Sequence, residues 1–163
     1  QVFDWGAYRK GVEQEKARAP TLAEMRAMAW QCIAAGANGL VFYSFFDLQK
    51  MNERNPFERR WSEVCEMAAE IKRFMPILLS IEPVPSVKVE APVSVETRLW
   101  RHAGSVYLLA VNGADEPVEA KAQVAGGFKS VVPQFGPAPA NDGNGGLTFK
   151  LTPLEPVLVR MVY

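Results

Sequence analysis

The spacing of apolar residues divides the chain into a first half with helical periodicity and a second half with the alternation of strands. Apolar side chains recur at helical spacing within residues 22–33 and 61–75, with charged side chains elsewhere on each helix. Thr21 and Glu24 form a capping-box pattern, so the first helix is expected to begin there. Between the helices, residues 40–43 are apolar on both faces, which is typical of a parallel strand covered on both sides.

The second half predicts strands separated by short turns. Residues 82–92 are rich in proline, and they predict a stiff linker between two domains. Strands are expected at 93–100, 106–112, 118–124, 128–132, 147–151 and 157–162. We therefore predict three parts: a helix-and-strand segment over 1–81, the linker over 82–92, and a small antiparallel β-sandwich over 93–163.

Composition places the chain among globular proteins and argues against two classes of partner. Of its 163 residues, 48% are hydrophobic and 22% are charged. Lys plus Arg and Asp plus Glu number 18 each, so no net charge recruits nucleic acid or an anionic membrane. No apolar run approaches the roughly 18 residues of a spanning helix, and no signal-peptide pattern is present in the sequence. We expect a soluble protein, and its compartment is not predicted.

The cysteines and the histidine do not form a recognisable metal or nucleophile motif. Cys32 and Cys65 lie on the predicted apolar faces of the two helices, where reduced core residues are expected. A disulfide or a metal pair is the alternative. His102 is the single histidine, which argues against a zinc site and against a histidine-based triad. We predict no cofactor and no metal.

Several segments occur in a characteristic order along the chain. They are QVFDWG, PTLAEMRAMAWQCIAAGANGLVFYSF, WSEVCEMAAEIKRF, VYLLAVN and VLVRMVY. This order resembles the C-terminal end of bacterial glycoside hydrolases, in which an eight-stranded β/α barrel is followed by a β-sandwich. The resemblance implies the seventh strand with its helix, then the eighth strand with its helix. The implied fold class is α/β plus all-β, a partial (quarter) TIM-barrel segment followed by a small antiparallel β-sandwich.

The resemblance also implies a chemistry carried by two carboxyl groups, a proton donor after the fourth strand and a glutamate nucleophile after the seventh. This sequence lacks the fourth strand and has Asp4 where the glutamate is expected. Asp4 and Asp47 lie nearest the ends of the two predicted strands, so we predict that they act as the catalytic acid and base. The alternative is structural, with Asp4 in a turn and Asp47 as a cap for the following segment.

Aromatic residues near the same strand ends suggest a surface on which sugar rings stack. The predicted substrate-binding residues are Trp5, Tyr8, Tyr43 and Phe45. Strand-end aromatics are as often part of a core, so packing is the alternative for this set. On the sandwich, Trp100 and Tyr107 offer a second carbohydrate-binding face, although buried cross-strand packing is favoured for them.

Two strands cannot close a barrel, and a two-stranded parallel sheet leaves unpaired edges and exposed apolar helix faces. We therefore expect a homo-oligomer, and a tetramer is the arrangement in which four copies would supply eight strands. The predicted function is that of a glycoside hydrolase-like protein that cleaves glycosidic bonds in a carbohydrate through carboxylates assembled between chains. The alternative is a non-catalytic carbohydrate-binding or structural assembly module derived from such an enzyme.

Overall fold

A computed structural model describes Val2, residues 18–50 and residues 56–163. The chain divides into two compact units. The first, here called the N-terminal unit, comprises Gln1–Arg26 and Gly39–Arg73, and the second, the sandwich unit, comprises Ala27–Asn38 and Phe74–Tyr163. The structure consists mostly of antiparallel sheet with a few helices, and it contains the expected sandwich-like arrangement.

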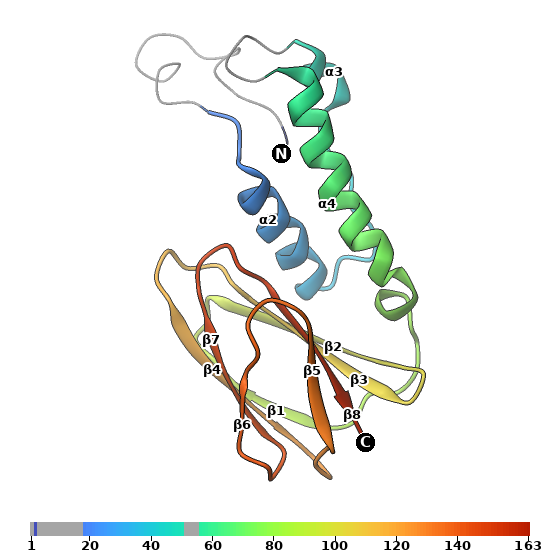
Figure 1. Ribbon diagram of the computed structural model, residues 1–163, viewed down its shortest axis with the longest axis vertical. Coiled ribbons are helices and arrows are strands. Elements are labelled where there is room, and N and C mark those ends of the chain that lie inside the picture. The colour runs from blue at the N-terminus through green and yellow to red at the C-terminus, as the bar shows by residue number, and fades with distance from the viewer. Residues whose placement is uncertain (1, 3–17, 51–55) are drawn as a thin grey trace. The chain divides into compact units, whose positions relative to one another are not determined.

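The sandwich unit contains two four-stranded antiparallel sheets, which Figure 1 shows with their strands labelled. One sheet has the order β1-β4-β7-β6 and the other the order β2-β3-β8-β5. The strands are β1 (Val87–Glu90), β2 (Val95–His102), β3 (Ser105–Asn112), β4 (Val118–Val124), β5 (Ser130–Phe135), β6 (Ala140–Asn141), β7 (Gly146–Leu151) and β8 (Val157–Val162). Strand β1 lies within the stretch that we predicted as a linker.

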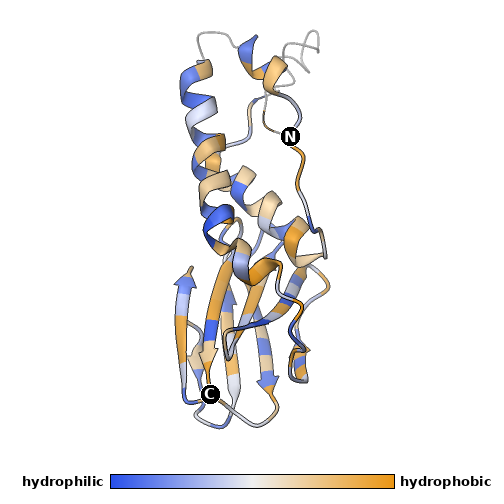
Figure 2. Ribbon diagram, turned by 90° about the vertical axis from the view of Figure 1, so that its right-hand side faces the viewer, coloured by the Kyte–Doolittle hydropathy of each residue, from blue (hydrophilic) through white to orange (hydrophobic). Residues whose placement is uncertain are grey.

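The sandwich core is built from side chains that alternate along the strands. Buried and exposed residues alternate along β4 and β7, and Figure 2 shows hydrophobic and hydrophilic residues interleaved along strands of the sandwich. The buried side chains include Leu108, Phe149 and Leu151 together with Val159 and Met161, all 3% exposed or less. Burial of this apolar surface is the main force that holds the two sheets together.

Strands β3 and β8 are buried on both faces, because helical segments of the same unit cover the outer face of their sheet. Leu109 and Leu158, which pair across β3 and β8, are 0% exposed although their neighbours Leu108 and Val159 fill the core between the sheets. The covering segments are the second half of helix α2 (Leu22–Ala34) and the end of helix α4 (Phe57–Leu78). The sandwich unit therefore has a third layer.

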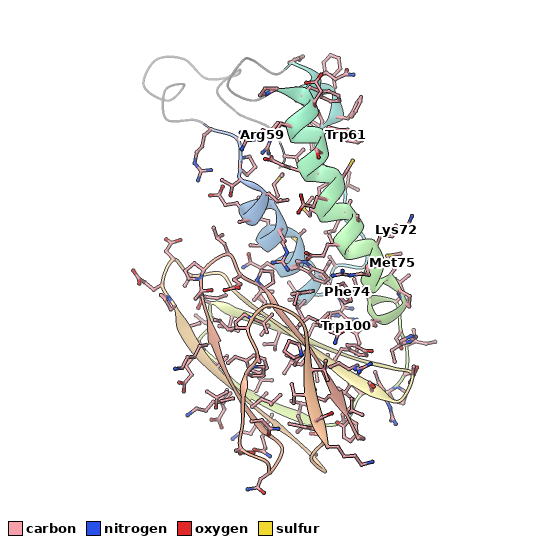
Figure 3. The ribbon with its side chains drawn as sticks, viewed as in Figure 1. Arg59, Trp61, Lys72, Phe74, Met75 and Trp100 are labelled. Carbon is pink, nitrogen blue, oxygen red and sulfur yellow. The ribbon has the colours of Figure 1, made fainter. Side chains whose placement is uncertain are left out.

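Three aromatic rings form the centre of this third layer. The ring of Trp30, which is 0% exposed, lies 5.9 Å from Phe74 and 4.8 Å from Phe135 between centroids. Phe74 and Phe135 are 5.4 Å apart with an interplanar angle of 74°. Such tilted and edge-to-face pairs are favourable beyond the area that they bury. Figure 3 shows Phe74 near Trp100, where the last turns of α4 meet the sandwich.

Polar contacts satisfy the ends of both helices on the sandwich. The Arg98 guanidinium donates to the carbonyl oxygens of Ile33 and Ala37, at 3.0 and 3.3 Å, so a cation lies at the C-terminus of α2. The indole N–H of Trp100 donates to the carbonyl oxygen of Leu78 at 3.1 Å, at the end of α4. Trp100 and Tyr107 are 3% and 7% exposed, so they pack rather than present a sugar-binding face.

A close approach between α2 and the loop after β3 explains one glycine. A Cβ atom on Gly113 would lie 2.5 Å from the amide nitrogen of Gln31 and 3.2 Å from the carbonyl oxygen of Ser94. A larger residue there would push the side chain of Gln31 away. The backbone N–H of Gly113 instead donates to the Ser94 carbonyl at 2.8 Å.

The first helix begins where the sequence predicts. The backbone N–H of Glu24 donates to the Thr21 hydroxyl at 3.2 Å, and the Thr21 N–H donates to the Glu24 carboxylate at 2.7 Å, which is the complete capping box. The Arg18 guanidinium adds a bidentate pair to the same carboxylate. Hydrogen bonds from Arg18, followed by that from the Thr21 backbone, lower the pKa of Glu24 to about 2.

The strand predicted at 40–43 is absent, which corrects our prediction. Strand assignment needs a ladder of hydrogen bonds, and this stretch makes one backbone contact to a described neighbour, from the Val2 N–H to the Tyr43 carbonyl at 3.4 Å. Val41 is 98% exposed, although the sequence predicted coverage on both faces. The stretch leads into the short helix α3 (Phe45–Gln49). A quarter TIM barrel is thus not established by the fold.

Helix α4 is longer than its apolar pattern predicts, because it begins at Phe57 and continues two residues beyond Pro76. The predicted apolar stripe is only partly buried, since Val64 is covered whereas Trp61, Cys65 and Met75 are exposed. Cys32 on α2 is also exposed, so the prediction that both cysteines are core residues is wrong. Among the helices that the structure describes, none is both long and apolar enough to cross a membrane.

Candidate functional site

The N-terminal unit contains an apolar groove beside the extended stretch that follows α2. Its volume is about 440 Å³. Side chains from this stretch, from α3, from α4 and from Val2 line it: Val2, Leu40, Val41, Phe42, Phe45, Leu48, Trp61, Val64, Cys65 and Ala68. None of these side chains carries a charge, so the groove is suited to apolar surface. Phe45, which the sequence singled out as a substrate-binding residue, is one of the residues that line it.

An aromatic cluster borders the groove. Phe45 makes edge-to-face contacts with Phe57 and Trp61, at 5.6 and 5.1 Å between ring centroids, and Phe57 stacks on Trp61 at 6.2 Å. Phe45 and Trp61 remain 49% and 40% exposed, so the cluster presents ring faces or edges to solvent. Trp61 lies near the beginning of α4, as Figure 3 shows. Sequence reasoning selected Phe45 for this surface but placed Trp61 in the core.

Asp47 lies at the start of α3, where its neighbours give it the contacts of a capping residue. Ser44 is the N-cap, and its hydroxyl accepts a hydrogen bond from the Asp47 N–H at 3.1 Å while donating to the Asp47 carboxylate. The Lys50 ammonium lies 3.7 Å from the other carboxylate oxygen. The side chain of Asp47 is 7% exposed. These contacts fit the structural alternative for Asp47, and its catalytic role stays a prediction.

Arg60 is a buried cation that the sequence did not single out. Its side chain is 5% exposed, and it donates to the carbonyl oxygen of Val2 at 3.1 Å and to the carboxylate of Glu63. Its Nη2 also lies 3.4 Å from the sulfur of Met25, whereas its Nε has no partner among the described atoms. Arg60 therefore joins α4 to the backbone of Val2 and to α2 inside an apolar unit. The pair Arg59-Arg60 within a mixed-charge stretch gave no signal that one of the two arginines is buried.

The remaining predicted site residues divide between exposed and undescribed positions. Tyr43 is 66% exposed, and its carbonyl accepts the Val2 N–H. The peptide bond between Tyr43 and Ser44 is cis. Asp4, Trp5 and Tyr8 lie outside the described residues, so the predicted pairing of Asp4 with Asp47 stays a prediction. Tyr43, Phe45 and Asp47 lie in the segment whose residues Phe42, Phe45 and Leu48 line the groove.

Comparison with known proteins supports the fold alone. No family model matches the chain, and no curated protein matches its sequence. The chain is similar in structure to a noncanonic maltogenic alpha-amylase, AmyB, from Thermotoga neapolitana, with a TM-score of 0.50 and 15% identity. The similarity covers 85% of this chain and 37% of the amylase chain. A likeness at this level of identity shows similarity of the fold alone, and it shows no catalytic role.

Proposed function

We propose that this chain takes part in glycosidic-bond hydrolysis, with its N-terminal unit as the closing quarter of a β/α barrel and its sandwich as the domain that follows the barrel in the sequence. The observation that carries the proposal is the structural likeness to the maltogenic alpha-amylase, which extends over most of this chain. The chain spans 37% of the amylase chain. Under this proposal, the remaining strands and helices of the barrel would be supplied from outside this chain.

The local geometry of the N-terminal unit supports the same proposal. Helix α2, the stretch at 40–43, the short helix α3 and helix α4 follow one another along the chain, and this order is compatible with adjacent βα units. The Val2 N–H donates to the Tyr43 carbonyl at 3.4 Å, which is a contact between the two segments that the proposal assigns to neighbouring barrel strands. In barrels, side chains that follow the strands form the active face, and under this proposal Ser44, Phe45 and Asp47 would occupy that position.

A panel of chromogenic α- and β-glycosides tests the catalytic proposal. We expect hydrolysis by the assembled protein and a loss of about 100-fold or more in kcat for Asp4→Asn, because a general acid or base contributes about that much. Ser44→Ala and Asp47→Asn form a matched pair. If Asp47 is a cap, both lower the stability by about 1 kcal/mol and leave kcat unchanged. A loss of kcat in Asp47→Asn alone would make Asp47 catalytic, and no turnover of any glycoside would refute the proposal.

A non-catalytic module is the second candidate, and the contacts of Asp47 favour it. The Asp47 carboxylate accepts a hydrogen bond from Ser44, the N-cap of α3, and lies near the Lys50 ammonium. These contacts are those of a residue with a structural role. In that case the protein would bind carbohydrate or support an assembly without turnover. Binding of oligosaccharides with no hydrolysis in the glycoside panel would select this candidate.

We also propose that further copies of the chain cover the apolar groove. Val41 borders the groove and is 98% exposed, and Phe46 in helix α3, which contributes Phe45 and Leu48 to the groove, is 64% exposed. A surface with both hollows and projections can be self-complementary, as an interface between identical subunits requires. The equal numbers of acidic and basic residues leave no net charge to oppose association.

Sedimentation velocity at micromolar concentration tests the assembly. We expect a species larger than the 18.1 kDa of one chain, and we expect Val41→Lys to convert it to monomer because a charge would be buried in the interface. Val93→Lys is the matched control, since Val93 is equally exposed, at 102%, but belongs to the sandwich unit. A wild-type protein that is monomeric under these conditions would refute the assembly.

A further inference from the structure

One end of the sandwich carries a hollow that is separate from the groove of the N-terminal unit. Figure 1 shows the turn between β4 and β5, the loop between β6 and β7 and the C-terminus at the same end of the sandwich. The hollow between them has a volume of about 790 Å³, which lies within the range of small-molecule sites. Its lining combines aromatic, amide and cationic side chains with exposed backbone: Gln123, Val124, Ala125, Gly126, Gly127, Phe128, Lys129, Gly143, Asn144 and Tyr163.

Hydrogen bonds hold the floor of this hollow in a fixed shape. The Val124 N–H donates to the Gly145 carbonyl at 3.0 Å, and the Gln123 amide donates to the Asn144 carbonyl at 3.0 Å, which joins the two loops. Gly145 has a φ of +87°, and a Cβ there would lie 2.9 Å from the Val124 carbonyl, so glycine permits this close approach. The loop after β6 is also closed by the Asp142 carboxylate, which accepts the N–H of Asn144 at 2.7 Å.

The chemistry of the lining fits a neutral polyhydroxylated ligand. Tyr163 is 40% exposed and lies beside Lys129, because the Lys129 N–H donates to the Val162 carbonyl at 2.7 Å. An aromatic ring can receive the C–H face of a pyranose, while an ammonium and an amide donate to its hydroxyls. Lys129 is the one charged side chain in the described lining, which is too little charge to favour a phosphorylated ligand.

Glycines leave space for a ligand to approach the backbone. A Cβ atom built on Gly126 or Gly143 would meet no heavy atom within 4 Å, so both backbones border open space. Backbone carbonyls at these positions can therefore reach ligand hydroxyls without an intervening side chain, whereas the Gly143 N–H donates to the Asn141 side chain at 2.9 Å. We propose that this hollow is a binding subsite for a soluble oligosaccharide, with Tyr163 as the stacking residue and Lys129 and Asn144 as polar contacts. The choice of ligand class rests on the proposed function.

Titration of the ¹⁵N-labelled protein with maltoheptaose, and separately with cellohexaose, tests the subsite by NMR. With one of the two sugars we expect saturable shifts of the Gly126, Lys129 and Asn144 amides. Affinity should fall about tenfold in Tyr163→Ala, about threefold in Lys129→Ala and no more than about twofold in Tyr163→Phe, which keeps the ring. Retained chemical shifts outside the hollow would show that each variant is folded.

Matched controls separate this subsite from other sugar sites. Val132→Ala removes an apolar side chain of similar exposure, 37%, elsewhere on the sandwich, and Lys150→Ala removes another exposed lysine, so both should bind as the wild type does. The subsite is refuted if neither sugar shifts the amides of the hollow, or if Tyr163→Ala binds unchanged. Shifts confined to the N-terminal unit would refute the subsite while supporting the proposed function, because binding is detected independently of hydrolysis.

Discussion

Trp30→Ala is expected to lower the free energy of unfolding of the sandwich unit by about 4 kcal/mol. The indole is fully buried and touches two other rings, so its removal loses transfer free energy and leaves a cavity that surrounding strands cannot fill. The cavity would lie against Phe74 and Phe135, on the outer face of the β2-β3-β8-β5 sheet. Urea unfolding followed by far-UV circular dichroism measures the change.

Met28→Ala provides the control on the same helix. Met28 is 40% exposed and lies two residues before Trp30, so we expect its replacement to change stability by less than about 0.5 kcal/mol. Trp30→Phe should cost less than Trp30→Ala because a ring remains in the layer. A loss of under 1 kcal/mol for Trp30→Ala would mean that the helical layer contributes little to the sandwich.

Arg60→Ala is expected to destabilise the N-terminal unit by about 3 kcal/mol. The substitution removes the hydrogen bond to the Val2 carbonyl and leaves Glu63, whose side chain is 17% exposed, with a weaker partner. Arg59 also contacts Glu63, at 3.2 Å, and so limits the loss. Thermal unfolding of the variant, compared with the wild type at equal protein concentration, measures the effect.

Two variants distinguish the role of the buried charge from that of packing. Arg60→Met keeps most of the side-chain volume, so it should be less destabilising than Arg60→Ala by at least about 1 kcal/mol. Arg59→Ala removes the exposed partner of the same glutamate, with a side chain 73% exposed, and should cost no more than about 1 kcal/mol. Equal losses in Arg59→Ala and Arg60→Ala would contradict the buried role assigned to Arg60.

The sandwich was predictable because alternation of apolar and polar residues is visible within its strands. Alternating residues over 118–124 and 147–151 form β4 and β7 nearly as expected, because alternation of buried and exposed side chains is itself the pattern of a strand with one face in the core. Thr21 and Glu24 likewise fix the helix start through contacts within one turn. The signals for these elements lie within a few consecutive residues, so the sequence alone predicts the elements.

The N-terminal unit was less predictable because its apolar residues lack local partners. Residues 40–43 have the composition of a buried strand, but a strand also needs neighbours to accept and donate its backbone hydrogen bonds. Cys65 and Trp61 followed an apolar stripe, yet both side chains remain exposed, because the described segments around them only partly cover that part of α4. For Asp47, Ser44 three residues earlier was the available signal of a cap, and the sequence left both roles open.

Helix α2 is divided between the two units, and this division restricts how the sandwich can be transferred to another protein by recombination. Residues from Ala27 onward cover Leu109 and Leu158, although they precede the strands in the chain. A recombination event before β1, in the proline-rich stretch, would transfer all eight strands without the half of α2 that covers them. The outer apolar face of the β2-β3-β8-β5 sheet would then be exposed to solvent. The eight strands therefore do not form a complete unit by themselves, and we expect them to be inherited together with helix α2.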